Sequence, residues 1–158
     1  MNTRQTRLDE LDLALIAALR ENPRASITSL ANATGAARGT IYGHLERLGS
    51  RGVITGYGPE VDAKAAGFGV LAFCTLEIAQ GTHDQTIEQL AAVTEIVEIH
   101  TVTGVGDLLL RIVAESNDHL HDLLQRITTI TTVRRSQTQL ALATPMRRSI
   151  AEVITSDG

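Results

Sequence analysis

The hydrophobic positions at the start of the chain recur every three or four residues, which is the spacing of one helix face. They are Leu8, Leu11, Leu15, Ile16 and Leu19. Asp9 can cap the free N–H groups of the first turn. Asn22-Pro23 then ends the helix, because the residue before a proline is driven out of the helical conformation.

Two more helices are expected within the first sixty residues. One follows Ser26, and Gly35 supplies the left-handed residue at its end. The next opens at Ala37 or Arg38. Its buried stripe consists of Ile41, Leu45 and Leu48. A helix, a tight turn containing glycine and a further helix form the helix-turn-helix pattern of DNA-binding proteins.

The polar face of the third helix is the candidate DNA-contacting surface. In a helix-turn-helix, the start of this helix reaches base edges, while Arg side chains and the helix N-terminus engage phosphates. The alternative is an ordinary solvated face. Gly39 and Gly43 favour function, because each costs an exposed helix about 1 kcal/mol relative to Ala. The candidate contacts are Arg38, Thr40, Tyr42, Gly43, His44 and Arg47.

After the third helix the pattern of apolar positions changes. Residues 50–57 predict a turn and a short strand, followed by a connector. From Val70 onward, apolar runs of strand length alternate with helical spacing. We expect strands at 70–78, 96–102, 108–113 and 133–143, one helix at 82–93, and a second helix capped by Asn117 or Asp118.

The order β-α-β-β-α-β predicts a ferredoxin-like domain, in which two helices cover one side of a four-stranded sheet. The fold class is therefore α+β, with an N-terminal winged helix-turn-helix at 1–56, a connector at 57–68 and a ferredoxin-like domain at 69–158. The other sheet face remains to be covered, and dimerisation through it is the simplest solution.

The distribution of charge favours the first third of the chain as the part that binds DNA. The 158 residues carry a net charge of −4. Residues 1–60 hold seven Arg against six acidic residues, a balance of +1, whereas residues 61–158 hold seven basic and twelve acidic residues, a balance of −5. Nucleic-acid binding is therefore expected in the helix-turn-helix and not in the second domain.

Composition also indicates a compartment. The single cysteine, Cys74, excludes an intramolecular disulfide and fits a reducing cytoplasm, where it would be a small buried hydrophobe. We expect neither a signal peptide nor a membrane span, because the chain has no apolar segment of the required kind. All basic residues except Lys64 are Arg, which indicates a GC-rich bacterial genome.

Catalytic and metal motifs are weak in this sequence. The five His residues are scattered, and His119 and His121 lie two apart on a predicted helix, facing different directions. Gly104-Val105-Gly106 lacks the third glycine of a dinucleotide fingerprint. We therefore predict no catalytic residue, no metal site and no cofactor, and expect the protein not to be an enzyme.

Several weak motifs become specific through their order and spacing. They are LDELDLALIAAL at 8–19, Arg24 with Leu30-Ala31, Leu48 with RGVITGY at 51–57, Val61-Asp62, Gly67 and EIHTVTGVGD at 98–107. Over essentially its whole length the chain resembles the Lrp/AsnC family, the leucine-responsive or feast/famine transcriptional regulators.

The resemblance implies binding to double-stranded DNA as a homodimer or a larger assembly of dimers, often octameric. It also implies an amino-acid effector near the Gly-x-x-Asp turn. Backbone N–H groups of such a turn can receive a carboxylate, and Asp107 can pair with an ammonium group. In the alternative, the glycines only permit the turn and Asp107 caps it. The candidate effector residues are Thr103, Gly104, Val105, Gly106 and Asp107.

The chain departs from the family pattern at three positions. His44 stands where an Arg is usual, Ala37 where a Ser is usual and Thr132 where a Gly is common. The first two bear on phosphate contacts and on capping of the third helix, and the third bears on the effector pocket.

Two other functions remain open. Siroheme decarboxylases have the same two-domain architecture and would hold tetrapyrrole carboxylates with His100, Arg111, Arg134 and Arg135. The chain could also be a sensor or an architectural DNA protein without a ligand. The sequence does not identify the effector, the operator or the final subunit number.

Overall fold

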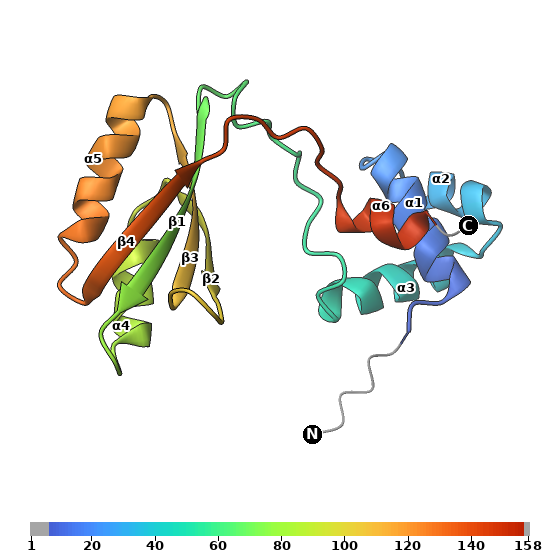
Figure 1. Ribbon diagram of the computed structural model, residues 1–158. Helices are drawn as coiled ribbons and strands as arrows, with labels where there is room; N and C mark the ends of the chain where they lie inside the picture. Colours follow the sequence, from blue (N-terminus) through green and yellow to red (C-terminus); the bar gives the residue numbers. More distant parts are fainter. Residues whose placement is uncertain (1–6, 157–158) are drawn as a thin grey trace. The chain divides into compact units, whose positions relative to one another are not determined.

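The computed structural model describes residues 7–156 and divides the chain into two compact units (Figure 1). The first comprises the residues up to Pro59 together with those from Met146, and the second is Glu60–Pro145. The predicted division of the chain at residues 57–68 agrees with this. The assignment of everything to residue 158 to the second domain was wrong, because the end of the chain packs with the first unit.

The first unit contains the three predicted helices. They are α1 (Glu10–Glu21), α2 (Ile27–Thr34) and α3 (Arg38–Ser50). Asp9 caps α1 as expected, and Asn22 ends it. Gly35 follows α2 with a left-handed φ of 71°. Leu15, Leu30 and Ile41, one from each helix, form the fully buried centre of this unit.

The strand predicted at 50–57 is absent. Residues 51–54 instead form a turn in which the N–H groups of Val53 and Ile54 both donate to the carbonyl of Leu48, at 2.9 and 3.2 Å. Gly52, with a φ of 67°, lets the chain reverse there. Because the two N–H groups bond back to the end of α3, they do not enter a β ladder.

A fourth helix of this unit, α6 (Ile150–Thr155), was not predicted. Ser149 caps it by accepting a hydrogen bond from the N–H of Glu152. The helix packs against α1, where Nη1 of Arg20 donates to Oγ1 of Thr155 at 3.3 Å. One and a half turns are too few to show a helical period in the sequence.

The second unit is the predicted ferredoxin-like sandwich. Its elements are β1 (Val70–Ile78), α4 (His83–Ala91), β2 (Ile96–Thr101), β3 (Leu108–Ala114), α5 (Asn117–Thr128) and β4 (Val133–Leu140). The antiparallel sheet has the order β2-β3-β1-β4, and α4 and α5 lie on one face (Figure 1). Ser116 caps α5, not Asn117 or Asp118, because its side chain accepts from the N–H of His119.

The two faces of the sheet differ in chemistry. Ala72, Cys74 and Leu76 of β1 point into the core under α4 and α5. Successive strand residues alternate between faces, so Phe73 and Thr75, both half-buried, lie on the other face. That face also carries the ion pair between Arg111 and Glu98, whose N–O distance is 2.6 Å. The uncovered face is therefore a mixed surface of apolar and charged side chains.

In the part of the chain from residue 7 to residue 156, no helix combines the length and the apolar character needed to cross a membrane.

Candidate nucleic-acid interface and ligand pocket

The outward face of α3 has the exposure that the sequence predicted. Ile41 and Leu48 are fully buried, whereas Arg38, Thr40, Tyr42 and Gly43 are exposed. Tyr42 alone has 64% of its surface accessible. Its ring and hydroxyl are therefore accessible to another molecule.

The N-terminus of α3 is open to an anion. Ala37 precedes the helix and provides no side-chain cap, so it leaves the first N–H groups free of a side-chain acceptor. Arg38 stands at this positive end of the helix dipole, where a cation is electrostatically unfavourable. Among the described residues, Arg38 has no hydrogen-bond or ion-pair partner. A phosphate group would relieve both features.

The glycines of α3 are not required by packing. A methyl group added at Gly39, Gly43 or Gly49 would meet no other atom within 4 Å, and none of the three has a positive φ. The fold therefore accepts alanine at these positions. Packing within the protein therefore does not explain glycine on the exposed face of α3.

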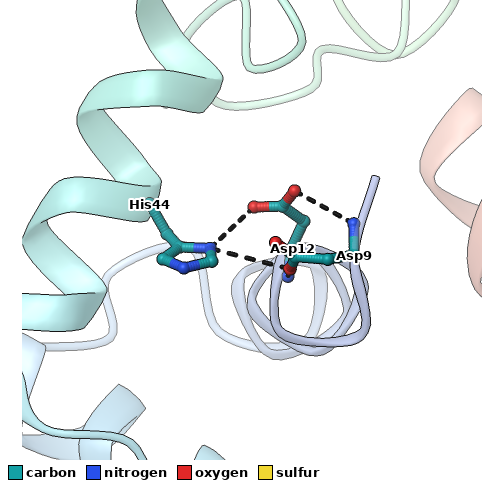
Figure 2. Close-up of side chains that lie close together, drawn as sticks. All are labelled: Asp9, Asp12 and His44. Atoms are coloured by element: carbon teal, nitrogen blue, oxygen red, sulfur yellow. Dashed lines mark hydrogen bonds and ion pairs between the residues drawn. The ribbon is translucent and has the colours of Figure 1, made fainter. Parts of the chain in front are cut away.

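His44 and Arg47, the other two predicted contacts, lie against the start of α1. Nδ1 of His44 is 2.9 Å from Oδ1 of Asp12. Figure 2 draws the side chain of His44 pointing toward Asp9 and Asp12. Nη2 of Arg47 is 3.0 Å from Oδ2 of Asp9 and 2.9 Å from Oδ1 of Asp12. The side chain of Asp12 is only 1% exposed, that of His44 17% and that of Arg47 42%. We call these four residues the α1–α3 cluster.

Asp9 and Asp12 both have lowered pKa values, which favours the ionised form of each carboxyl group. Burial would raise the pKa of Asp12, but hydrogen bonds from His44, the Asp9 N–H and Arg47 outweigh it and lower that pKa. The pKa of Asp9 is also lowered, chiefly by the N–H of Asp12. The sequence predicted Asp9 as the cap of α1, and the structure adds the reciprocal bond from the Asp9 N–H to Asp12. The contact of both carboxylates with α3 was missed, because it depends on how the helices pack.

The Gly-rich turn between β2 and β3 is fixed against the end of β1. The N–H of Asp107 donates to the carbonyl of Leu76, and Oδ2 of Asp107 accepts from the N–H of Ile78, both at 2.8 Å. Gly106 has a φ of 84°, and a Cβ there would lie 2.3 Å from Cγ2 of Thr75. Gly104 also has a positive φ but faces open space. Asp107 and Gly106 thus have structural roles in the turn.

An open pocket of about 340 Å³ lies beside this turn. Asp107 is the member of the predicted effector set that lines it, whereas Thr103, Gly104, Val105 and Gly106 do not. His83 and Thr101, which the sequence analysis missed, also line this pocket. Nε2 of His83 and Oγ1 of Thr101 lie 2.8 Å apart. The pocket is lined by Ile78, Ala79, Gln80, Gly81, His83, Thr101, Val102 and Asp107.

Thr132, where the resemblance led us to expect a glycine, supports the pocket wall. It is buried, and its hydroxyl accepts a hydrogen bond from Oγ1 of Thr86 at 2.8 Å. Its carbonyl accepts from the N–H of Ala79, also at 2.8 Å. Thr132 therefore ties α4 and the loop that lines the pocket to the start of β4.

Two family models together cover most of the chain. One, described as the Lrp/AsnC ligand binding domain, matches residues 71–150, and the other, described as a winged helix-turn-helix DNA-binding domain, matches residues 8–55. The transcriptional regulator FL11 of Pyrococcus horikoshii is 30% identical over 87% of this chain and 91% of its own length. The regulatory protein AsnC of Escherichia coli K12 is 28% identical over 90% and 95%.

Solved structures give the same picture. The structure of E. coli AsnC superimposes with a TM-score of 0.85 at 27% identity, covering 92% of this chain and 99% of that one. A feast or famine regulatory protein of M. tuberculosis complexed with L-methionine has a TM-score of 0.78 at 29% identity, covering 89% and 96%. Nothing in these matches supports the siroheme decarboxylase alternative. Two of its suspects, His100 and Arg111, instead bond to Glu98.

Proposed function

Because the chain belongs to the Lrp/AsnC family of transcriptional regulators, we propose that the outward face of α3 enters the major groove of double-stranded DNA. The uncapped N-terminus of α3, with unpaired Arg38 beside it, carries this proposal. Arg38 and the free N–H groups contact phosphate, while Thr40 and Tyr42 reach base edges. Gly43 lets the helix approach the duplex closely.

His44 and Arg47 enter this proposal differently from the other predicted contacts. Both are held by the carboxylates of α1 in the α1–α3 cluster, where they fix the angle at which α3 is presented. They reach the phosphate backbone only when the cluster opens.

A salt titration of DNA affinity tests the assignment of Arg38. The slope of log affinity against log salt is negative, and each lost phosphate contact reduces its magnitude by about 0.9. We expect Arg38→Ala to lower the slope by about that amount per subunit, measured by fluorescence anisotropy on a promoter fragment. Arg126→Ala removes the same charge from α5 and is the matched control, with an unchanged slope. Equal slopes for wild type and Arg38→Ala would refute the contact.

We also propose that an amino acid is the effector and binds in the pocket beside the Gly-rich turn, with no other cofactor. A volume of about 340 Å³ suits a molecule of that size. Oδ2 of Asp107 already accepts from Ile78, but an ionised carboxylate has further lone pairs for an ammonium group. His83 and Thr101 supply further hydrogen-bond partners. Thr103, Gly104, Val105 and Gly106 do not line the pocket, so in this proposal they form the turn that presents Asp107 and do not contact the effector.

Calorimetry with the twenty amino acids tests the effector site. Asp107→Asn keeps an oxygen for the N–H of Ile78 but removes the charge, so we expect about tenfold or greater loss of effector affinity while the turn stays folded. Asp122→Asn, which changes an exposed carboxylate on α5 away from the pocket, is the control and should retain wild-type affinity. If Asp107→Asn bound the effector as tightly as wild type, Asp107 would have no part in the site.

Assembly and location follow from the same function. We propose a homodimer formed through the uncovered sheet face, assembling into a higher oligomer such as an octamer. A two-fold dimer would read paired half-sites about one DNA turn apart. Its place of action is the cytoplasm, where chromosomal DNA lies and where the buried thiol of Cys74 stays reduced.

A further inference from the structure

The α1–α3 cluster brings three metal-ligating groups to one point. Asp9 and Asp12 come from the start of α1 and His44 from the middle of α3, and Figure 2 shows their side chains converging. One carboxylate oxygen from each Asp and one nitrogen of His44 all lie within 4.8 Å of one another. Two carboxylates and an imidazole are a donor set that divalent first-row transition metals accept.

A cation already occupies the centre of this group. Nη2 of Arg47 lies 3.0 Å from Oδ2 of Asp9, 2.9 and 3.0 Å from the two oxygens of Asp12 and 3.0 Å from Nδ1 of His44. A guanidinium nitrogen of this kind carries two hydrogens, so it can donate to two of these four atoms at a time. The position offers more ligand atoms than the guanidinium can use.

Nδ1 of His44 lies beside a hydrogen-bond acceptor, Asp12, and a hydrogen-bond donor, Arg47, and can bond to only one of them at a time. When it is protonated it donates to Asp12 but meets the N–H group of Arg47. When it is unprotonated it accepts from Arg47 but turns its lone pair toward the oxygen of Asp12, 2.9 Å away. A metal ion removes the conflict, because it accepts the lone pairs of His44 and both carboxylates together.

The charge balance also favours a divalent ion over the guanidinium. The two ionised carboxylates carry −2, and the guanidinium of Arg47 offsets only half of that charge. A divalent ion would neutralise both carboxylates by itself and release Arg47. Asp9 and Arg47 are about half exposed and can move, whereas Asp12 and His44 are held by the packing of α1 against α3.

We propose that Asp9, Asp12 and His44 form a binding site for a divalent transition-metal ion, which displaces the guanidinium of Arg47. The freed Arg47 then lies on the outward side of α3 and can reach DNA phosphate. This second step rests on the proposed DNA contact of α3, while metal binding itself does not. The ion would thus act as a co-regulator of DNA affinity, separate from the effector pocket.

Co²⁺ is a suitable probe because its visible absorption reports the ligands around it. Full-length protein without an affinity tag should take up one Co²⁺ per chain, with a band that Zn²⁺ abolishes. His44→Gln and Asp9→Asn should each weaken binding by about tenfold or more, and Asn still caps α1. His121→Gln, an exposed His on α5, is the control and should bind as wild type does.

Arg47→Gln separates this proposal from a purely structural salt bridge. Removal of the competing cation should make Co²⁺ bind more tightly, by about tenfold, whereas a cluster that only braces the fold would lose affinity or never bind. Absence of a one-to-one complex, an unchanged affinity in His44→Gln or a weaker affinity in Arg47→Gln would each overturn the site.

The link to DNA has its own readout. Saturating Zn²⁺ should steepen the salt dependence of DNA affinity in wild type by about one phosphate contact per subunit, and should leave Arg47→Gln unchanged. A metal complex with unaltered DNA binding would refute the coupling. If α3 is not the DNA-binding helix, the Arg38→Ala titration fails while the Co²⁺ titration still succeeds, so the two hypotheses fail separately.

Discussion

At the scale of single residues, the contacts of Gly106 show why glycine stands there. Its φ of 84° is one that other residues rarely adopt, and its missing Cβ leaves room for the methyl group of Thr75. Two independent constraints therefore act on one position. Gly104, two residues earlier, has a similar φ of 99° but nothing near it, so only the backbone constraint applies there.

Alanine substitutions at these two glycines should therefore differ in cost. We expect Gly106→Ala to lower the free energy of unfolding by about 2–3 kcal/mol, because strain and a steric clash add. Gly104→Ala should cost about 1 kcal/mol. Urea unfolding followed by circular dichroism measures both. Equal losses would show that the close approach to Thr75 is relieved at little cost.

The carboxylates of the α1–α3 cluster should make stability depend on acid pH. The pKa values of Asp9 and Asp12 are lowered in the folded state, so the unfolded state binds protons first as the pH falls. Their stabilisation is complete above about pH 5, and is lost progressively as the pH falls through the unfolded value near 4 and on toward the lower folded values.

Thermal unfolding from neutral pH to about pH 3 measures this effect. Asp12→Asn should reduce the fall in melting temperature at acid pH, because an amide side chain does not titrate. Asp84→Asn, on the exposed start of α4, should follow wild type. An acid limb as steep in Asp12→Asn as in wild type would place the responsible carboxylates elsewhere, with Glu95 and Glu98 as the next candidates because their pKa values are also lowered.

At the scale of the elements, periodicity located the long helices and all four strands. It worked because each has a buried face, as with Leu120, Leu123 and Ile127 on α5. It failed on α6, which is too short to show a period, and on residues 50–57, where turn hydrogen bonds replace the strand. The outward residues of α3 could be predicted from helix geometry. The contacts of His44 and Arg47 with Asp12 could not be predicted, since they depend on tertiary packing.

The glycine on the outward face of α3 gives a prediction in which stability and function diverge. Gly43→Ala should stabilise the first unit by about 1 kcal/mol, because alanine favours the helix and meets no neighbour. It should weaken DNA binding if the duplex approaches the backbone there. Gly49→Ala, near the end of the same helix, should leave DNA affinity unchanged. Gel-shift titration and thermal melting together decide between close approach and an ordinary solvated face.

At the scale of the whole molecule, the dimer proposed above would form through the uncovered face of the sheet. Phe73 lies at its centre between the strands that carry Arg111 and Gln139. The ion pair Arg111–Glu98 lies beside Phe73 and gives the face a specific charge pattern. A partner copy would have to match both the apolar side chain and the charges, which favours one register of association over many.

Phe73→Glu should therefore dissociate the dimer. A carboxylate at the centre of the face would lose its hydration in the dimer, which costs several kcal/mol, and the neighbouring Arg111 is already paired with Glu98. Sedimentation velocity should show a shift toward the monomer mass of 16.9 kDa. Leu142→Glu, at an almost fully exposed position beyond β4, is the control and should leave the mass unchanged. A dimer that survives Phe73→Glu uses another surface.

The packing of α6 on α1 has a consequence for synthesis of the chain. The whole second unit lies between α1 and α6 in the sequence, so a growing chain contains α1 long before it contains this neighbour. A chain truncated before α6 would retain the outward residues of α3 but would leave one side of α1 exposed to solvent.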